Sequence, residues 1–365
     1  AGAFTAVPEG EAATRAWIAA GEPIVAEYKR LNGGRLADYV VSHAGALAFP
    51  RSFQLLAEGG TLAFYGASSG YHFTFTGKPG SVSPEAMMRR AQVRAGEAVL
   101  VYYGPRTTEL VDAAGLEMIE AVRAIGARAV VATTTDGQRE FVQSLGFEDA
   151  VAGVVSIEEL SRRVHDFDWP DTMPALPDAK RDTEAFRIAV RDFQDRTLKP
   201  FGSAVGALLR SPDNPRGAPD VILERAGHDT LGVSTSLVKP FTGRVLYSED
   251  CDGRRYAFYA PQVWTRQRRI LMPTATIAGT HLSNAYEVTR MNDMIAAGLL
   301  EVTEPTVVPW HGLPAAHQAM WDNRHAGATY VVNHALPALG LRGRDALLEA
   351  WAATGPGSGP SEAEA

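Results

Sequence analysis

Two glycines between a predicted strand and a predicted helix are the first residues whose spacing suggests chemistry. Residues 97–104 have the pattern of a buried strand that ends at Gly104, and Gly115 opens the amphipathic helix that follows. A glycine-tight turn here lets backbone N–H groups and a helix N-terminus meet a diphosphate without a Cβ in the way. The turn is longer and poorer in glycine than G-x-G-x-x-G, and Arg106 and Thr107 are the side-chain donors that could compensate. The alternative is a turn that has lost its cofactor.

Hydroxyl groups and a guanidinium follow the next predicted strand, residues 128–134. Where an NAD enzyme places a carboxylate to hold the ribose 2′-OH, this chain has Thr133, Thr134 and Thr135, with Arg139 one helical turn further on. Hydroxyls and a guanidinium suit a 2′-phosphate, so the pattern favours NADPH over NADH. A threonine-rich helix cap followed by a solvated arginine is the other interpretation.

Composition excludes several classes of function. The 365 residues are 45% hydrophobic and carry a net charge of -7, so no electrostatic footprint for nucleic acid or an anionic membrane is present. Cys251 is the single cysteine, and no Cys/His spacing predicts a metal site. Because no apolar run reaches the ~20 residues needed to span a bilayer, we expect a soluble, cytoplasmic protein.

Strands alternate with helices along most of the chain, which predicts an α/β fold with a Rossmann-type doubly wound parallel sheet. We expect a partial, duplicated Rossmann half and a linker over residues 1–80. A cofactor-binding domain follows over residues 81–337, with an insertion at about 157–219. Residues 338–365 are expected to form a C-terminal helix and a disordered tail. Within the cofactor-binding domain, residues 270–281 are predicted to form one strand.

One internal repeat supports this organisation. Residues 39–70 and 220–253 share the same plan of strand, small-residue turn, helix, glycine and strand. They look like two copies of the second half of a nucleotide-binding fold, which we call the first copy and the second copy. Only the second copy is preceded in this sequence by a matching first half.

Several motifs carry a family resemblance over roughly residues 80–336. SPEAMMRRAQVRAGEAVLVYYG resembles the entry to the cofactor domain of medium-chain dehydrogenases/reductases, and PDVILERAG, GTHLSN and PAAHQAM resemble crotonyl-CoA carboxylase/reductases. The chain is most similar to the acrylyl-CoA reductase part of propionyl-CoA synthases, which are multidomain enzymes. The resemblance implies an NADPH-dependent enoyl-CoA reductase acting on an acyl-CoA thioester. Hydride would go to the β-carbon, and the α-carbon would then be protonated.

The resemblance also implies catalytic residues. The family motif GSHFAN corresponds to Gly279–Asn284, which places His281 near the substrate α-carbon and Asn284 beside it. Leu282 and Ser283 replace the family's Phe and Ala, which puts carboxylation in doubt. Without the matched motif, a histidine after a strand would be taken as a structural residue.

Further cofactor-binding residues follow from the same resemblance. Glu224 and Gly227 match the family turn that faces the cofactor, and Ser248 matches the loop near the nicotinamide. Gly279 is expected to bind the cofactor together with Gly104 and Gly115. Glu249 and Asp250 stand where the family has small residues, whereas the first copy keeps the small residues GASSG at the equivalent loop. Which copy holds the cofactor therefore stays open.

The expected partners are the acyl-CoA substrate and upstream catalytic domains of the same enzyme, because nothing in the chain corresponds to the family's N-terminal barrel-like domain. Pairing through the edge of the sheet makes a homo-oligomer plausible. Two other functions stay open: a reductive carboxylase of enoyl-CoA, and a catalytically inactive structural Rossmann domain of a megasynthase.

Overall fold

The computed structural model describes residues 4–76, 91–105, 108–169, 176–177, 181–225, 230–247, 255–264, 266–271, 275–279, 285–299, 306–322, 324 and 329–332. The chain divides into two compact units, Ala1–His281 and Leu282–Ala365. The smaller unit contains α11 (Ala285–Ala296), β12 (Thr306–Pro309), η2 (Trp310–Gly312), α12 (Leu313–Trp321) and β13 (Thr329–Val332). In this unit, β12 and β13 pair in parallel.

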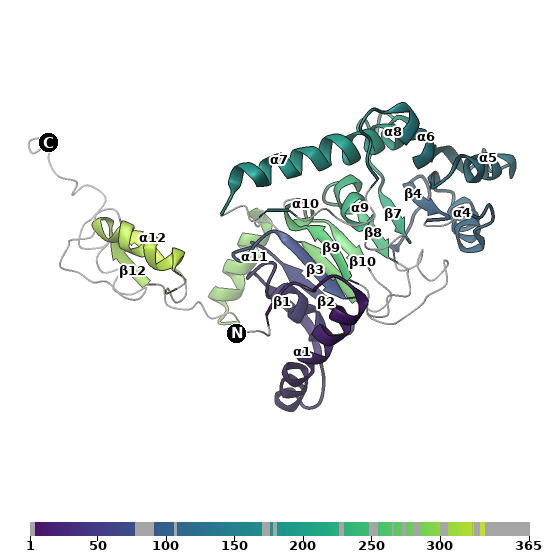
Figure 1. The fold of residues 1–365 in the computed structure, drawn as a ribbon. Coiled ribbons are helices and arrows are strands. Elements are labelled where there is room, and N and C mark those ends of the chain that lie inside the picture. Colours follow the sequence, from purple (N-terminus) through teal and green to yellow (C-terminus); the bar gives the residue numbers. More distant parts are fainter. Residues whose placement is uncertain are drawn as a thin grey trace, which may run out of the picture. The chain divides into compact units, whose positions relative to one another are not determined.

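A nine-stranded sheet in the order β1-β2-β11-β10-β8-β7-β4-β5-β6 forms the centre of the larger unit (Figure 1). All neighbouring strands in it are parallel except β10 and β11. This confirms the predicted α/β class. The strands are β1 (Ala37–Ser42), β2 (Leu56–Phe64), β4 (Ala98–Tyr103), β5 (Arg128–Thr133), β6 (Val151–Ser156), β7 (Val221–Glu224), β8 (Arg244–Tyr247), β10 (Arg269–Leu271) and β11 (Ala275–Gly279).

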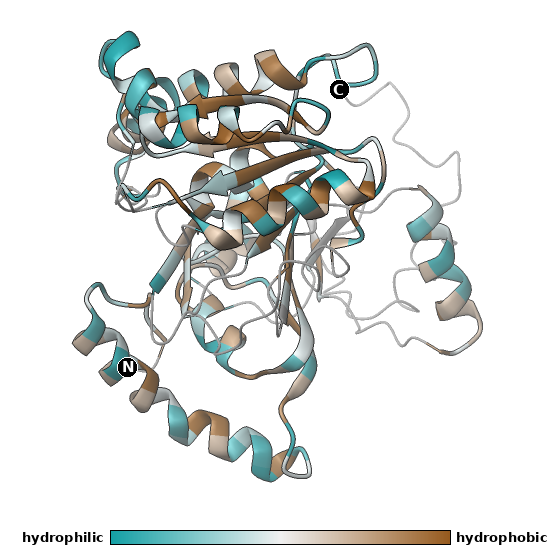
Figure 2. Ribbon diagram, turned by 90° about the vertical axis from the view of Figure 1, so that its right-hand side faces the viewer, coloured by the Kyte–Doolittle hydropathy of each residue, from teal (hydrophilic) through white to brown (hydrophobic). Residues whose placement is uncertain are grey.

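Helices flank this sheet, and β3 (His72–Thr76) and β9 (Arg255–Tyr259) form a separate antiparallel pair. Figure 2 shows hydrophobic residues concentrated on the strands, with hydrophilic residues on the outer helix faces, as amphipathic helices on a buried sheet require. The helices are α1 (Glu11–Leu31), α2 (Phe49–Gln54), α4 (Ala113–Ile125), α5 (Asp136–Ser144), α6 (Ile157–Arg163), α7 (Thr183–Phe193), the π-helix η1 (Gln194–Leu198), α8 (Lys199–Leu209), α9 (Leu231–Leu237) and α10 (Ala260–Trp264).

The repeat seen in the sequence is also a repeat of structure. β2 and β8 end at Phe64 and Tyr247, and β3 and β9 begin at His72 and Arg255, so both pairs are 183 residues apart. β7, β8 and β10 are the fourth, fifth and sixth strands of a complete Rossmann order, β6-β5-β4-β7-β8-β10. β1, β2 and β11 take the same three places in the first copy. The first copy therefore includes β11, and the second copy includes β4, β5, β6 and β10 with the turns that follow them.

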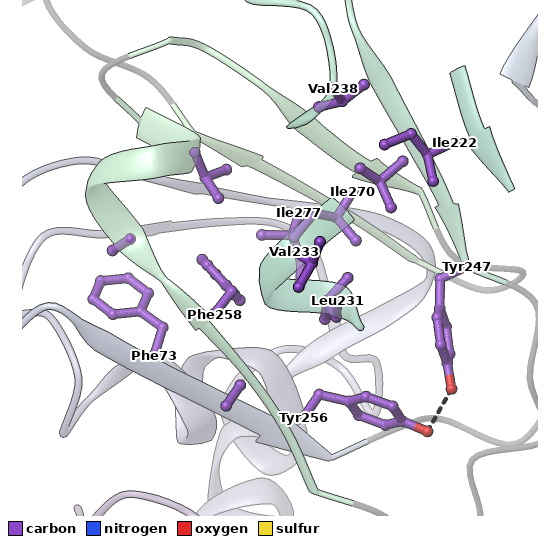
Figure 3. Packing of buried hydrophobic residues seen from close by; sticks show 14 of the residues in the cluster. Phe73, Ile222, Leu231, Val233, Val238, Tyr247, Tyr256, Phe258, Ile270 and Ile277 are labelled. Carbon is purple, nitrogen blue, oxygen red and sulfur yellow. Dashed lines mark hydrogen bonds between the residues drawn. The ribbon is translucent and has the colours of Figure 1, made fainter. Parts of the chain in front are cut away.

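A local pseudo-two-fold axis relates the two copies. In the β3–β9 ladder His72 pairs with Tyr259 and Thr76 pairs with Arg255, so each copy contributes the same positions to the ladder. In the β10–β11 ladder Ile270 pairs with Ile277. Figure 3 shows these two isoleucines next to one another in the core. The chain therefore contains, within itself, an interface of the kind that a symmetric dimer forms between subunits.

The antiparallel β10–β11 pair reverses the direction of three strands. β1, β2 and β11 run opposite to the other six, so their carboxyl ends lie at the opposite edge of the sheet. Since ligands of parallel α/β sheets bind outside the carboxyl ends of the strands, the two copies present their functional edges on opposite sides.

Two predicted elements differ from the structure. The strand predicted over 270–281 is a hairpin of β10 and β11, and the sequence has Pro273 between them, which lacks the N–H that a continuous ladder needs. The repeat plan places a glycine between its helix and its second strand, but α2 ends at Gln54 and β2 begins at Leu56, before the glycine pair Gly59 and Gly60. The apolar face of residues 56–64 packs in the core as a strand, which overrides the local helical pattern.

Two absences concern only the part of the chain that the structure describes. No helix there is long and apolar enough to cross a bilayer. Nor does any group of three or more His, Cys, Asp or Glu side chains in those residues form a potential metal site.

Candidate functional site

The turn between β4 and α4 has the geometry of an anion site, but the chain's own side chains occupy it. Gly104 follows β4 with a φ of 55°, a left-handed conformation that favours glycine. Its N–H donates to the Asp112 carboxylate over 2.8 Å. A Cβ on Gly115 would lie 2.4 Å from Asp112 Oδ2, so this carboxylate sits directly at the start of α4. A carboxylate therefore occupies the place where a dinucleotide enzyme binds diphosphate.

Arg225 neutralises this internal anion. Its guanidinium donates to the same Oδ2 of Asp112, and both side chains are largely buried. Burial raises the pKa of Asp112, but the hydrogen bonds from Arg225 and the Gly104 amide outweigh burial, and the pKa lies below its ordinary value. Asp112 is therefore ionised at neutral pH, and a diphosphate at this turn would meet a negative charge.

Gln138 fills the space between the ends of β4 and β5. Its side chain is fully buried, and its oxygen accepts from the N–H groups of Thr134 and Thr135 at 3.0 and 3.1 Å. Its amide nitrogen donates to the Glu109 carbonyl over 2.9 Å. A Cβ on Gly104 would lie 2.3 Å from that nitrogen, so the turn and the glutamine fit closely. The glutamine thus ties the long turn to the next strand.

The residues predicted to recognise the 2′-phosphate also have internal partners. Thr133 Oγ1 donates to the Thr135 carbonyl over 3.1 Å, and Thr134 Oγ1 donates to the Gly104 carbonyl over 3.0 Å. Thr135 is the N-cap of α5 and forms a capping box with Gln138. Arg139 pairs with Glu159 at 2.6 Å and with Asp136 at 3.5 Å. The threonine-rich cap that the sequence offered as an alternative is present.

Glu224 lies in the core. Its carboxylate is fully buried and accepts hydrogen bonds from the hydroxyls of Thr230 and Ser234. The Ser234 hydroxyl is 3.1 Å from the Tyr102 hydroxyl, and burial together with the Glu224 charge raises the pKa of Tyr102 well above its ordinary value. These contacts join β4, β7 and α9 beneath the carboxyl edge of the second copy.

Gly279 lies at the other edge of the sheet. It ends β11, pairs in parallel with Phe64 at the end of β2, and donates its N–H to the Arg268 carbonyl over 3.1 Å. Gly279, the first residue of GTHLSN, therefore lies beside the end of β2 in the first copy. Gly104 and the threonines lie at the carboxyl edge of the second copy, so the structure does not bring Gly279 together with them.

Two loops of the first copy meet where β1 and β2 end, residues 43–48 and 65–71. Ser69 N–H and Ser68 Oγ both donate to the Ala44 carbonyl, at 2.8 and 3.0 Å. The His43 ring stacks on Tyr65 at a centroid distance of 5.8 Å, and both side chains are exposed. Neither loop contains a carboxylate. The result is a surface of small and aromatic residues without a carboxylate.

Six predicted site residues fall outside the described part of the chain: Arg106, Thr107, Gly227, Ser248, His281 and Asn284. Conversely, sequence reasoning missed Asp112, Gln138 and Arg225. The position of Asp112 was a usable signal, because aspartate directly before a helix is a preferred N-cap residue. The partnership with Arg225 had no local signal.

Comparisons with known proteins agree with the resemblance. No family model matches the sequence. The chain is 24% identical over 238 residues to the crotonyl-CoA carboxylase/reductase of Cereibacter sphaeroides, a match that covers 65% of this chain and 47% of that protein. The chain is thus similar at low identity to a crotonyl-CoA carboxylase/reductase, and it spans about half the length of the curated relative that it matches.

Two solved structures are similar at lower identity. One is the crotonyl-CoA carboxylase/reductase AntE in complex with NADP, with 21% identity and a TM-score of 0.38, covering 68% of this chain and 54% of that one. The other is the 2-octenoyl-CoA carboxylase reductase CinF in complex with NADP and 2-octenoyl-CoA, with 19% identity and a TM-score of 0.33. That match covers 76% of this chain and 53% of the other.

Proposed function

We propose that this chain is part of an NADPH-dependent enoyl-CoA reductase, with acrylyl-CoA as substrate, within a multidomain enzyme that forms propionyl-CoA. We place its reductase edge where β1, β2 and β11 end. The observation that carries this placement is the parallel pairing of Gly279 with Phe64. It sets the start of the GTHLSN segment beside the small-residue loop of the first copy.

The first copy has the chemical character that a nicotinamide site needs. The loop after β2 is uncharged, whereas the corresponding loop of the second copy has Glu249 and Asp250 in the sequence. A carboxylate beside a nicotinamide would stabilise the positively charged oxidised ring, so the small size of the residues Gly66–Gly70, rather than the missing charge, is what suits this loop to a nicotinamide. The loops at 43–48 and 65–71 thus suit one half of a cofactor site.

The second copy does not fit NADPH as its side chains stand. The diphosphate position holds the Asp112 carboxylate, and Arg139 is bound by Glu159 and Asp136. Gly104, Gly115, Thr133–Thr135 and Glu224 remain predicted cofactor residues, but here they support the fold. We therefore assign the second copy a positioning role: its strand β10 pairs with β11 and so holds the segment that begins at Gly279.

His281 and Asn284, which lie outside the described residues, are the residues that we propose to contact the enoyl-CoA. When bound, NADPH would supply the hydride for reduction of the α,β double bond. Among ordinary side chains a histidine is the best suited to hold or deliver a proton near neutral pH, because its unperturbed pKa is about 6.5. The chain's own contribution would be to orient the thioester and handle the proton.

The experiment is oxidation of NADPH on addition of acrylyl-CoA, followed by absorbance, for the protein extended on its N-terminal side and for the same protein with His281→Ala. We expect turnover in the first and at least tenfold slower turnover in the second, with unchanged NADPH affinity. Mass analysis of the product with and without bicarbonate distinguishes reduction from reductive carboxylation. A carboxylated product would overturn the proposed reaction.

One observation favours a second candidate function, a structural domain without catalysis. In a Rossmann fold the cofactor binds at the point where the strand order reverses, which here lies between β4 and β7. The Asp112–Arg225 ion pair fills this point, the one that is complete in the described residues. If the extended protein neither binds nor oxidises NADPH, the structural function is the better account.

A further inference from the structure

β1 is an edge strand with an uncovered apolar face. Tyr39 and Val41 project from this face and are 79% and 68% exposed. Unpaired edge strands with exposed apolar side chains are rare in stable proteins, because they invite pairing with another strand. Because the two copies share one strand order, β1 can be compared with its counterpart in the second copy, β7.

The second copy shows what covers the corresponding strand. Val41 pairs with Ala63 as Leu223 pairs with Leu246, and Ala63 and Leu246 occupy equivalent positions 183 residues apart. Tyr39 and Val41 therefore correspond to Val221 and Leu223, both fully buried. In the second copy these side chains pack in a cluster with Met118, Ile119 and Val122 of α4.

The free edge of β1 has a counterpart that is paired. β7 pairs in parallel with β4, and Val99 and Val101 lie opposite Val221 and Leu223. Among the described strands none pairs with β1 on the side away from β2. In the second copy, β4 thus pairs with the edge of β7, and α4, the helix that follows β4, covers its face.

The helix before β1 lacks its strands as well. α8 precedes β7 and packs against β5 and β6. α1 precedes β1, yet it packs against α2, and only Thr14, Trp17 and Gly21 of its 21 residues are buried. Figure 1 shows α1 projecting from the end of the sheet near β1 and β2. Among the described residues, the edge and the face of β1 thus lack counterparts of β4 and α4, and α1 lacks counterparts of β5 and β6.

We propose that β1 is the docking edge for a further βα unit of the β4–α4 kind, contributed by the same polypeptide on the N-terminal side of α1. Its strand pairs in parallel with β1, and its helix covers Tyr39 and Val41. The N-terminal side follows from the second copy, where β4 and α8 both precede β7 in the chain. The unit would also complete a switch point in front of residues 43–48, so this inference deepens the proposed function without depending on its redox chemistry.

The test is hydrogen exchange of residues 37–42, measured by mass spectrometry in this chain and in the protein extended on its N-terminal side. We expect at least tenfold slower exchange in the extended protein. Equal exchange rates would overturn the proposal, as would an N-terminal coding sequence without a βα pattern. NADPH turnover is measured separately. If β1 is protected in the extended protein but no NADPH is oxidised, the proposed reductase function is wrong and the docking of the βα unit on β1 still holds.

A double variant sharpens the test. Tyr39→Lys with Val41→Lys should remove the protection in the extended protein while leaving the folding of this chain unchanged, since both side chains are exposed here. Ile188→Lys, at a position 60% exposed on α7, is the matched control and should keep the protection. Sedimentation measures self-association in the same samples. If the protection of β1 depends on protein concentration, a second molecule of this protein occupies the edge, and the proposed N-terminal βα unit is ruled out.

Discussion

Gly279 and Phe64 pair in parallel at the ends of β11 and β2, although β11 follows the strands of the second copy in the chain. This pairing requires the chain to reverse between β10 and β11, so that β11 leaves the sheet of the second copy and serves as the sixth strand of the first. The segment with the strongest family resemblance is therefore attached to the copy that precedes it by about two hundred residues.

Replacing Asp112 with Asn should open the diphosphate position of the second copy. Asparagine remains a good N-cap and can still accept from Gly104, but the negative charge is lost and Arg225 becomes available to an anion. We expect NADPH affinity to rise about tenfold, equivalent to roughly 1.4 kcal/mol. A fluorescence titration measures this, and Asp149→Asn, which removes an exposed partner of Arg123, is the control. Unchanged affinity would mean that Gln138 and the turn, rather than charge, exclude the cofactor.

His281→Ala tests the residue that the resemblance assigns to the substrate. If His281 orients or protonates the acyl group, kcat should fall at least tenfold while the NADPH dissociation constant stays constant. His317→Ala, on α12, is the matched control. Identical kinetics for His281→Ala and the parent would make His281 a structural residue.

The contact between Ile270 and Ile277 should be essential to the joint between the two copies. Both side chains are fully buried, and truncation of Ile277 to Ala leaves a cavity at the pseudo-two-fold axis. We expect a loss of about 2–4 kcal/mol in the free energy of unfolding. Urea denaturation measures it, with the exposed Val41→Ala as a control expected to change stability by less than about 0.5 kcal/mol. A loss below about 1 kcal/mol for Ile277→Ala would show that this joint is not tightly packed.

His72 should make the protein sensitive to acid. Burial and the nearby charge of Arg255 lower the pKa of His72 from 6.5 to about 4, and its Nε2 has no partner among the described residues. The folded state binds its proton less well than the unfolded state, so stability is complete above about pH 6.5 and falls as the pH drops toward 4. The loss is on the order of 3 kcal/mol at most.

Unfolding midpoints between pH 7 and pH 4 check this expectation. His72→Gln should remove much of the slope in that window, because the neutral amide does not titrate. His165→Gln, whose parent side chain is 93% exposed, should not change it. A slope that is the same in the parent and in His72→Gln would assign the acid sensitivity to other groups.

Much of the fold was predictable from the sequence, because alternating strands and helices are local patterns. The repeat is one example. The strands predicted over residues 97–104 and 128–134 are two more, since the structure has β4 (Ala98–Tyr103) and β5 (Arg128–Thr133) there. The reversal before β11 was not predictable, since it depends on pairing with a strand far away in the chain. For the same reason the sequence grouped Gly104 and Gly279 into one site, whereas the structure places them at different edges of the sheet.

The candidate site was less predictable than the fold. Thr133, Thr134, Thr135 and Arg139 have side chains that suit a phosphate, but they also suit a helix cap and an ion pair, and composition cannot rank these uses. Only the positions of Glu159 and Gln138 show which partners these residues have.

The proposed reductase function is best tested by the oxidation of NADPH on addition of acrylyl-CoA. This chain and its N-terminally extended form are assayed side by side. We expect turnover in the extended protein, little or none in this chain, and loss of turnover in the extended Tyr39→Lys, Val41→Lys variant. Equal turnover by this chain alone, or none by the extended protein, would show that the proposed function is wrong.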